Sequence, residues 1–175
     1  MNRFALAKAI YDISNLKGEF VLRSGTTAVE YFDKYLFEAN PIILKSIAEH
    51  LKALLPNCYD QLAGLEMGGI PIVTALSLET GSQALFVRKK AKEYGTCKLA
   101  EGGNIAGKSL VIIEDVVTSG GAIIDAVNEL RARGAIIDTV LCVIDRENTG
   151  RKSLEAINLE FKPLFTKSIL ESAGE

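Results

Sequence analysis

The sequence is poor in the residues that build metal centres and disulfide frameworks. It has one His, three Cys and no Trp among 175 residues. Cys58, Cys97 and Cys142 are odd in number and far apart, and His50 is a single histidine that we expect on a helix surface. This content excludes a familiar zinc arrangement and argues against a disulfide framework. A reducing, cytoplasmic location fits it best.

Long hydrophobic runs and an excess of one charge are also missing. No apolar run approaches the roughly 20 residues of a membrane helix, and the first residues lack the apolar stretch of a signal peptide. Twenty basic and 22 acidic residues give a net charge of −2, which argues against bulk nucleic-acid binding. We therefore expect neither a membrane nor a nucleic-acid partner.

What is present is an alternation of strand and helix patterns from about residue 59. Apolar runs predict strands at 61–65, 83–88, 109–113 and 139–144, and helical spacing predicts helices at 70–79 and 121–133. This order is typical of a parallel sheet. Before it we expect a helix at 4–16, a hairpin with strands at 19–22 and 28–35, and a helix at 41–55. After it, residues 161–170 predict a strand and a short helix.

These elements predict one α/β domain spanning residues 1–175. Its core would cover about 40–157, and a small hood would form from about 1–38 and 158–175. A chain of this length buries about 70% of its unfolded surface.

The most informative stretch runs from Leu110 to Gly121. Four apolar residues predict a buried strand that ends at Glu114 and Asp115, and a turn with two hydroxyls and two glycines leads into a helix. Converging backbone N–H groups and a helix N-terminus make a phosphate cradle. The carboxylates would repel phosphate, and they suit sugar hydroxyls or a metal ion. The simpler alternative is an ordinary turn with two solvated acids.

Residues 111–121 (VIIEDVVTSGG) resemble the phosphoribosyl-diphosphate (PRPP) signature of the type I phosphoribosyltransferases. In that family the paired acids hold the ribose 2′- and 3′-hydroxyls, and the following loop wraps the 5′-phosphate. The resemblance implies the family's fold, a central mostly parallel sheet flanked by helices with a small hood. It also implies that PRPP is bound by Glu114, Asp115, Val116, Val117, Thr118, Ser119, Gly120, Gly121 and Ala122.

A basic connection of unusual length spans residues 88–103. Taken alone, its cations are most simply interpreted as a solvated loop. The pattern Arg-Lys-x-Ala-Lys-x-x-Gly resembles the catalytic loop of orotate phosphoribosyltransferases, which reaches across a dimer interface to the partner's active site. The resemblance implies a homodimer and PRPP contacts from Arg88, Lys89 and Lys92, with Lys92 the main catalytic cation. Tyr94 stands where many members have His, so a proton-donating role is not carried over.

Three more stretches resemble this family in the family's order. Residues 20–25 (FVLRSG) place Arg23 toward the substrate, and Tyr31 and Phe32 match the aromatic pair beside orotate. Arg146 matches the arginine that recognises the pyrimidine, and Thr118 is assigned to the same base. Without the family pattern, Arg146 beside two acids also fits a simple ion pair.

Residues 66–71 (EMGGIP) match the family's diphosphate-binding loop, with Met67 and Gly68 at PRPP. This chain lacks the Tyr-Lys pair that some bacterial members carry there. The loop then offers backbone amides and no cation of its own.

Taken together, the resemblance implies an enzyme that transfers the phosphoribosyl group of PRPP to orotate in UMP synthesis, with Lys92, Asp115 and Glu114 as its catalytic residues. Mg²⁺ would be held mainly by PRPP and water, and no residue is assigned as a direct ligand. One alternative is a phosphoribosyltransferase for another base, against which the 88–103 loop and the N-terminal motif argue. The other is a PRPP-sensing, nucleic-acid-binding regulator on the same fold. It should carry a basic face or DNA-binding domain, and the sequence shows none.

Overall fold

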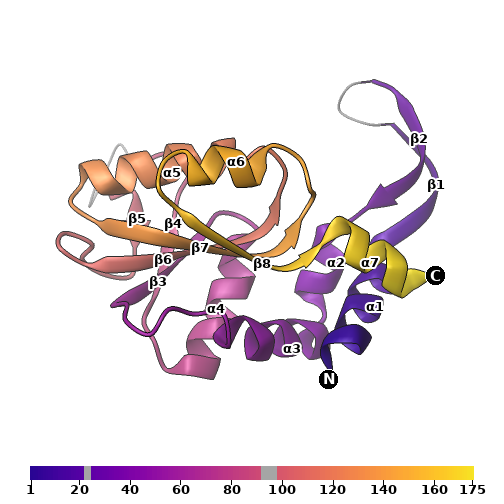
Figure 1. Ribbon diagram of the computed structural model, residues 1–175, viewed down its shortest axis with the longest axis horizontal. Helices are drawn as coiled ribbons and strands as arrows, with labels where there is room; N and C mark the ends of the chain where they lie inside the picture. The colour runs from indigo at the N-terminus through magenta and orange to yellow at the C-terminus, as the bar shows by residue number, and fades with distance from the viewer. Residues whose placement is uncertain (22–24, 92–97) are drawn as a thin grey trace.

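The computed structural model describes residues 1–21, 25–91 and 98–175, and its centre is a six-stranded sheet (Figure 1). The strand order is β5-β4-β3-β6-β7-β8, parallel except for the antiparallel β4–β5 pair. The strands are β3 (Gln61–Leu65), β4 (Ala84–Val87), β5 (Ala100–Glu101), β6 (Ser109–Val117), β7 (Ile136–Asp145) and β8 (Glu160–Thr166). The predicted mostly parallel α/β sheet is confirmed.

Helices cover both faces of this sheet. On one face lie α3 (Pro41–Lys52) and α4 (Gly69–Thr80), and on the other α5 (Gly121–Ala132) and α6 (Gly150–Glu155) (Figure 1). Most predicted elements of this region lie within a few residues of their expected bounds, whereas β5 and α6 were not anticipated. Within the described part of the chain, no helix is long and apolar enough to cross a membrane.

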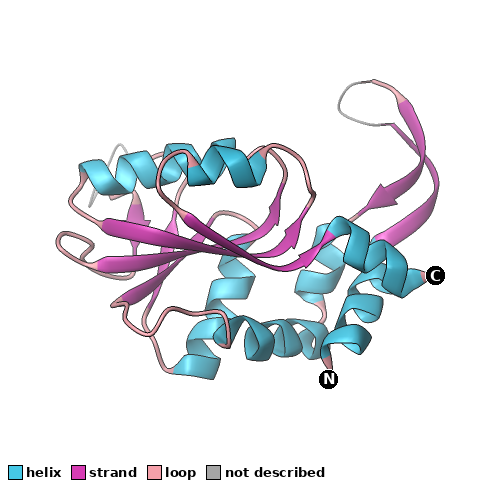
Figure 2. Cartoon of the chain, viewed as in Figure 1, coloured by secondary structure: helices cyan, strands magenta, loops and turns pink. Residues whose placement is uncertain are grey.

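The N-terminal region combines α1 (Arg3–Ser14), a hairpin of β1 (Asn15–Val21) and β2 (Thr27–Phe32), and α2 (Lys34–Ala39). The hairpin projects from the body of the molecule (Figure 2). The predicted first helix is too long, because Asn15 already pairs with Phe32. The predicted return strand is also too long: the Asp33 side chain accepts a hydrogen bond from the Tyr35 N–H and begins α2.

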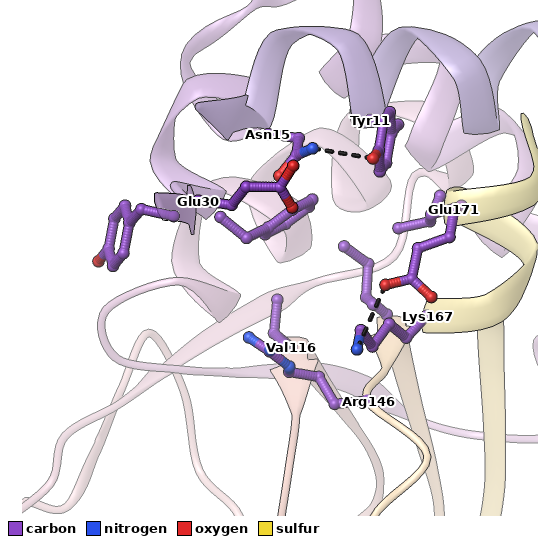
Figure 3. A pocket seen from close by; sticks show the side chains of 11 residues that line it. Tyr11, Asn15, Glu30, Val116, Arg146, Lys167 and Glu171 are labelled. Carbon is purple, nitrogen blue, oxygen red and sulfur yellow. Dashed lines mark hydrogen bonds and ion pairs between the residues drawn. The ribbon is translucent and has the colours of Figure 1, made fainter. Parts of the chain in front are cut away.

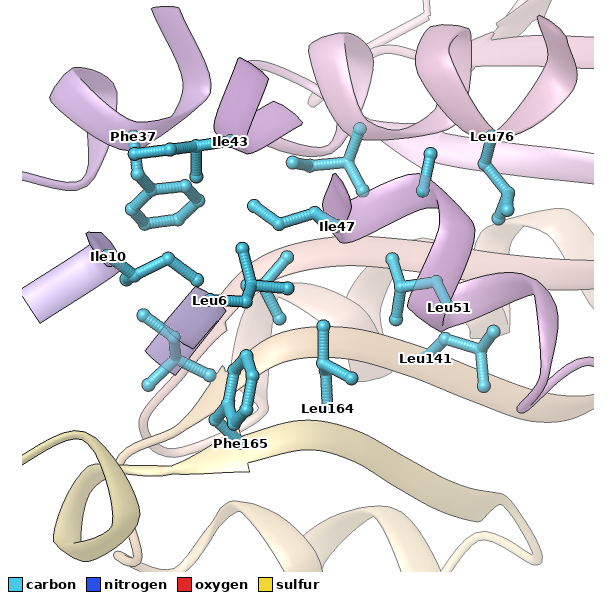
Figure 4. Close-up of a cluster of buried hydrophobic side chains, with 14 of the residues drawn as sticks. Leu6, Ile10, Phe37, Ile43, Ile47, Leu51, Leu76, Leu141, Leu164 and Phe165 are labelled. Atoms are coloured by element: carbon cyan, nitrogen blue, oxygen red, sulfur yellow. The ribbon is translucent and has the colours of Figure 1, made fainter. Parts of the chain in front are cut away.

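Alternating side chains of β6 divide the core in two. Val111 and Ile113 face α3 and α4, and Leu110 and Ile112 face α5, as the two-residue period of a strand requires. The first cluster also takes in helix α1 and strand β8 (Figure 4), and its large members include Leu6, Ile10, Phe37, Ile47, Leu51, Leu141, Leu164 and Phe165.

The hood therefore differs from its expected outline. α1 and α2 share the main core, and β8, expected in the hood, is the edge strand of the main sheet. α7 (Lys167–Gly174) packs against α1, which brings the two ends of the chain to the same side of the molecule (Figure 1). Most of the described part of the β1–β2 hairpin projects away from the core, and Phe32 at the end of β2 packs against it.

Strand β6 is longer than predicted and sets the position of the site. It pairs with β3 only as far as Ile113, while on its other side it pairs with β7 through Val117. The direction of winding changes between β3 and β6, because β4 lies outside β3 and β7 lies outside β6. Ligands of open α/β sheets bind at such a point, at the carboxyl ends of the strands.

Candidate active site

The loop after β6 surrounds a cavity of about 200 Å³. Its wall consists of residues expected to bind PRPP: Glu114, Val116, Val117, Thr118, Ser119, Gly120, Gly121 and Ala122, together with Ile123. Gly120 has φ +78°, a conformation that favours glycine, and a Cβ there would crowd Leu154. The loop thus enters α5 with backbone N–H groups at the helix N-terminus, a geometry suited to an anion.

The acidic pair lies inside β6, so the expectation that Glu114 and Asp115 end the strand is wrong. Pairing with β7 continues past them. The Glu114 Oε1 accepts a hydrogen bond from the Asp115 N–H at 3.0 Å, and the Asp115 Oδ1 accepts one from the Val116 N–H. Asp115 is only 1% exposed. The alternative of two solvated strand-end acids is therefore wrong for Asp115.

Two residues of α2 complete this acidic group. Lys34 forms an ion pair with the Asp115 Oδ2, and Glu38 is buried beside the same carboxylate. Burial raises the pKa of Glu38 to about 9, helped by its hydrogen bond with Asp115. Burial also raises the pKa of Glu114 well above its usual value, and the neighbouring Asp115 charge adds to the effect.

Asp115 behaves in the opposite way. Burial alone would raise its pKa, but hydrogen bonds with Glu114 and Lys34 outweigh burial and lower it. For Lys34, burial lowers the pKa, and the contact with Asp115 more than compensates, so that the pKa is raised. At neutral pH the group is an ionised Asp115 paired with a charged Lys34, beside a protonated Glu38.

A second cavity of about 200 Å³ lies between the hairpin and the sheet (Figure 3). Tyr31 and Phe32 of β2 line it, as does Arg146 at the end of β7. Arg146 and Lys167 lie on one side of it, and Asn15 and Glu30 on the other (Figure 3). The structure thus brings together three of the residues expected at the base. Thr118, also expected there, lines the loop cavity instead.

The guanidinium of Arg146 is available to a ligand. Among the described residues it has no ion-pair or side-chain hydrogen-bond partner, because both neighbouring acids are engaged elsewhere. Asp145 lies 3.7 Å from the Arg151 guanidinium and accepts a hydrogen bond from the Glu147 N–H at 2.9 Å. The Glu147 carboxylate accepts hydrogen bonds from Ser168. The simple ion-pair alternative for Arg146 is therefore wrong within this part of the chain.

The two remaining loops meet beside the acidic pair. The Glu66 Oε1 accepts a hydrogen bond from the Lys89 N–H at 2.6 Å, which joins the 66–69 turn to the start of the basic loop. Arg88 lines a cavity with Glu66 and donates its backbone N–H to the Leu99 carbonyl at 2.9 Å. The expected 88–103 connection is shorter than predicted, because Ala100 and Glu101 form β5.

Gly68 lies directly against Asp115. A Cβ at this position would overlap the Asp115 carboxylate, so the close approach requires glycine. Met67 is exposed next to it. Two predicted site residues, Arg23 and Lys92, lie outside the described residues, as does Tyr94.

Sequence patterns did not identify Lys34, Glu38 or Lys167 as site residues. Lys34 and Glu38 are four residues apart, as on one face of a helix, but nothing local connects that face with Asp115. Lys167 reaches the cavity between the hairpin and the sheet only because β8 pairs with β7 and α7 follows β8.

Comparison with known proteins agrees with this geometry. Residues 37–163 match the family described as "Phosphoribosyl transferase domain". The chain is 54% identical over 170 residues to an orotate phosphoribosyltransferase of Nocardioides sp., covering 97% of this chain and 95% of that one. It is 41% identical over 174 residues to one of Pyrococcus abyssi, covering 97% and 96%.

A solved structure shows the same fold. The crystal structure of the Mycobacterium tuberculosis H37Rv orotate phosphoribosyltransferase superposes with a TM-score of 0.88 at 27% identity, covering 96% of this chain and 98% of that chain. These relatives favour the orotate enzymes over the two alternatives, an enzyme for another base and a regulator. The chain belongs to the phosphoribosyltransferase family, and within it to the orotate phosphoribosyltransferases.

Proposed function

We propose that this chain transfers the phosphoribosyl group of PRPP to orotate, giving orotidine 5′-monophosphate and diphosphate, in the synthesis of UMP. One observation carries the proposal. The cavity between the hairpin and the sheet (the base cavity) and the cavity in the loop after β6 (the loop cavity) share a wall residue, Val116. A base beside Arg146 and a phosphate in the loop after β6 would then lie on either side of this strand. The ribose C1′ would lie between them.

The loop cavity suits the sugar phosphate. Backbone N–H groups of residues 118–121 and the start of α5 would bind the 5′-phosphate. Glu114 and Asp115 would accept hydrogen bonds from the ribose hydroxyls, and such a bond is strong when the acceptor is charged, as Asp115 is.

The base cavity suits a planar anion. The guanidinium of Arg146 can pair with pyrimidine oxygens in bidentate fashion, and Tyr31 and Phe32 supply aromatic surface. Lys167, whose ammonium lies 3.2 Å from the Glu171 carboxylate, adds positive charge to the same wall and would attract the orotate carboxylate. We assign Arg23 to the same carboxylate.

The reaction needs positioning more than a protein nucleophile. The orotate N1 forms a bond to C1′ as the bond from C1′ to diphosphate breaks, and the N1 proton passes to the departing diphosphate. Positive charge grows on the ribose and negative charge on the leaving group in the transition state. Fixed geometry and prearranged charge therefore supply the catalysis, with Lys92, Arg88 and Lys89 at the leaving group.

The residues present fit a magnesium ion that the substrate carries. Within the described ranges there is no group of three His, Cys, Asp or Glu residues placed to bind a metal. Glu114 is the carboxylate that lines the loop cavity, and an ion held there would take most of its ligands from diphosphate and water oxygens. When bound, Mg²⁺ neutralises charge on the diphosphate.

We further propose a cytoplasmic homodimer in which the basic loop of one subunit closes the active site of the other. The support is the resemblance of the loop sequence and the joining of its two ends at Arg88 and Leu99.

A direct assay tests the proposed reaction. The full chain is incubated with PRPP, Mg²⁺ and, in turn, orotate, uracil, adenine and hypoxanthine, and both the nucleotide and the diphosphate formed are measured. We expect orotidine 5′-monophosphate and diphosphate in equal amounts from orotate, and little product from the other bases. Efficient use of uracil or a purine, or no product from orotate, would overturn the proposal.

A further inference from the structure

Lys34 is the first residue of α2 and lies next to the acidic pair of β6. Its helix begins at the Asp33 cap, so Lys34 and Glu38 share one face, and that face meets β6. The Lys34 ammonium forms an ion pair with the Asp115 Oδ2 and lies 5.2 Å from the centre of the Tyr35 ring. Helix α2 thus brings a cation to the site.

The surroundings of Asp115 explain why a cation is needed there. Its carboxylate meets the Val116 N–H, the Lys34 ammonium and the backbone of Gly68, and the residue is 1% exposed. A carboxylate buried this deeply stays ionised only when it is paired. Glu38 is 5% exposed and is a neutral neighbour at pH 7, which leaves Lys34 as the balancing charge.

The same contact blocks the sugar. With Lys34 on one oxygen and Val116 on the other, Asp115 has no open side for a ribose hydroxyl. The Lys34 side chain is 34% exposed, so solvent reaches it and it has room to turn. The nearest ligand charge would be the diphosphate, because Asp115 touches Gly68 of the 66–69 turn. That turn carries no cation of its own.

We propose that Lys34 is a PRPP-binding residue that changes partner. In the free chain it holds the Asp115 carboxylate charged and in place. When PRPP binds, its ammonium turns to the diphosphate beside the 66–69 turn, and the freed Asp115 oxygen accepts a ribose hydroxyl. The inference rests on the proposed use of PRPP, and it assigns the missing cation of that turn to helix α2.

Diphosphate binding tests the inference apart from turnover. Calorimetric titration of the full chain with magnesium diphosphate measures the leaving-group site without a sugar or a base. We expect Lys34→Met to weaken diphosphate binding at least tenfold and Lys34→Arg to retain most of it. Lys45→Met is the control, because Lys45 is also a helix lysine in an ion pair, but its partner is Glu49 and the pair lies on the surface of α3. It should bind like the wild type.

A second pair of variants removes any question of folding. Asp115→Asn, which frees Lys34 from its ion pair, should bind diphosphate at least as tightly as the wild type. Asp115→Asn combined with Lys34→Met should bind at least tenfold more weakly than Asp115→Asn. Both charges are then absent from the buried site, so no carboxylate is left unpaired. Equal diphosphate affinity with and without Lys34 would overturn the inference. Failure of the wild type to use orotate would instead count against the proposed reaction.

Discussion

Glu147 caps the first turn of α7 from the loop after β7. Its Oε2 accepts a hydrogen bond from the Ser168 N–H at 2.7 Å, and its Oε1 accepts one from the Ser168 Oγ at 2.9 Å. This contact joins the segment that carries Arg146 to the helix that carries Lys167. It also leaves the Arg146 guanidinium free to face the base cavity (Figure 3).

Glu147→Ala should therefore loosen the base cavity. We expect the KM for orotate to rise severalfold, the KM for PRPP to change little and the thermal midpoint to fall. Glu129→Ala, which removes an exposed helix glutamate paired with Arg133, is the control and should leave both KM values unchanged. Equal rises in both KM values would contradict a role confined to the base.

The stability effect of Glu147 should depend on pH. Hydrogen bonds from Ser168 hold the pKa of Glu147 below its usual value of 4.5. Its contribution is thus present above that value and is lost as the pH falls through the folded-state pKa. The difference in midpoint between wild type and Glu147→Ala should be seen at neutral pH and vanish in acid.

Lys167 can be tested against a near-identical surface pair. Its ammonium lies 3.2 Å from Glu171 with both side chains 50% exposed, while Lys8 lies 3.4 Å from Asp12 with 48% and 53% exposed. Lys167→Met should raise the KM for orotate about threefold to tenfold, on the order of 1 kcal/mol for one partly screened charge contact. Lys8→Met should leave it unchanged. The same KM for orotate in both variants would show that Lys167 does not contribute to orotate binding.

Glu38 should make the folded chain less stable as the pH rises. Its pKa is raised from 4.5 to about 9 by burial and by Asp115. Its favourable contribution is complete below the unfolded-state value near 4.5 and is lost as the pH rises through the folded-state value near 9. Thermal midpoints measured across this range should fall for the wild type relative to Glu38→Gln. Glu49→Gln, at an exposed pair of α3, is the control. Parallel curves for wild type and Glu38→Gln would contradict a protonated Glu38.

The proposed sharing of each active site between two subunits predicts that mixed dimers recover activity. Lys92→Ala and Asp115→Asn should each be nearly inactive. If the basic loop serves the partner, a mixed dimer holds one site with both residues intact. Free exchange at equal amounts should then restore about a quarter of the wild-type activity, since half of the dimers are mixed and each has one working site. No recovery, with subunit exchange shown by a mass-tagged chain, would contradict a site shared between subunits.

Local sequence patterns were sufficient for much of this fold. Parallel strands buried on both faces are continuous apolar runs, which is why β3 and β7 were found near their observed bounds. The loop after β6 was predicted because glycines and hydroxyls at the start of a helix let backbone N–H groups converge on a phosphate. Residues 116–122 do line one cavity.

What was missed depends on contacts between distant segments. β6 continues past Ile113 only because β7 pairs with it there, and adjacent acids otherwise indicate a strand end. The short helix α2 begins at the Asp33 cap and is held by the burial of Phe37. Six residues are too few for a helical repeat of apolar positions to be recognised in the sequence. No pattern within residues 33–39 could place Lys34 at Asp115, because the fold alone brings β6 to that helix.

Orotate should bind in the cavity beneath the hairpin, where Arg146 recognises it. The most direct measurement compares Arg146→Ala with the wild type in orotate kinetics and in PRPP binding without orotate. We predict that kcat/KM for orotate falls at least tenfold, about 1.4 kcal/mol or more of lost transition-state stabilisation, while the Kd for PRPP stays within about twofold, or ~0.4 kcal/mol. Unchanged orotate kinetics, or equal losses for orotate and PRPP, would contradict it.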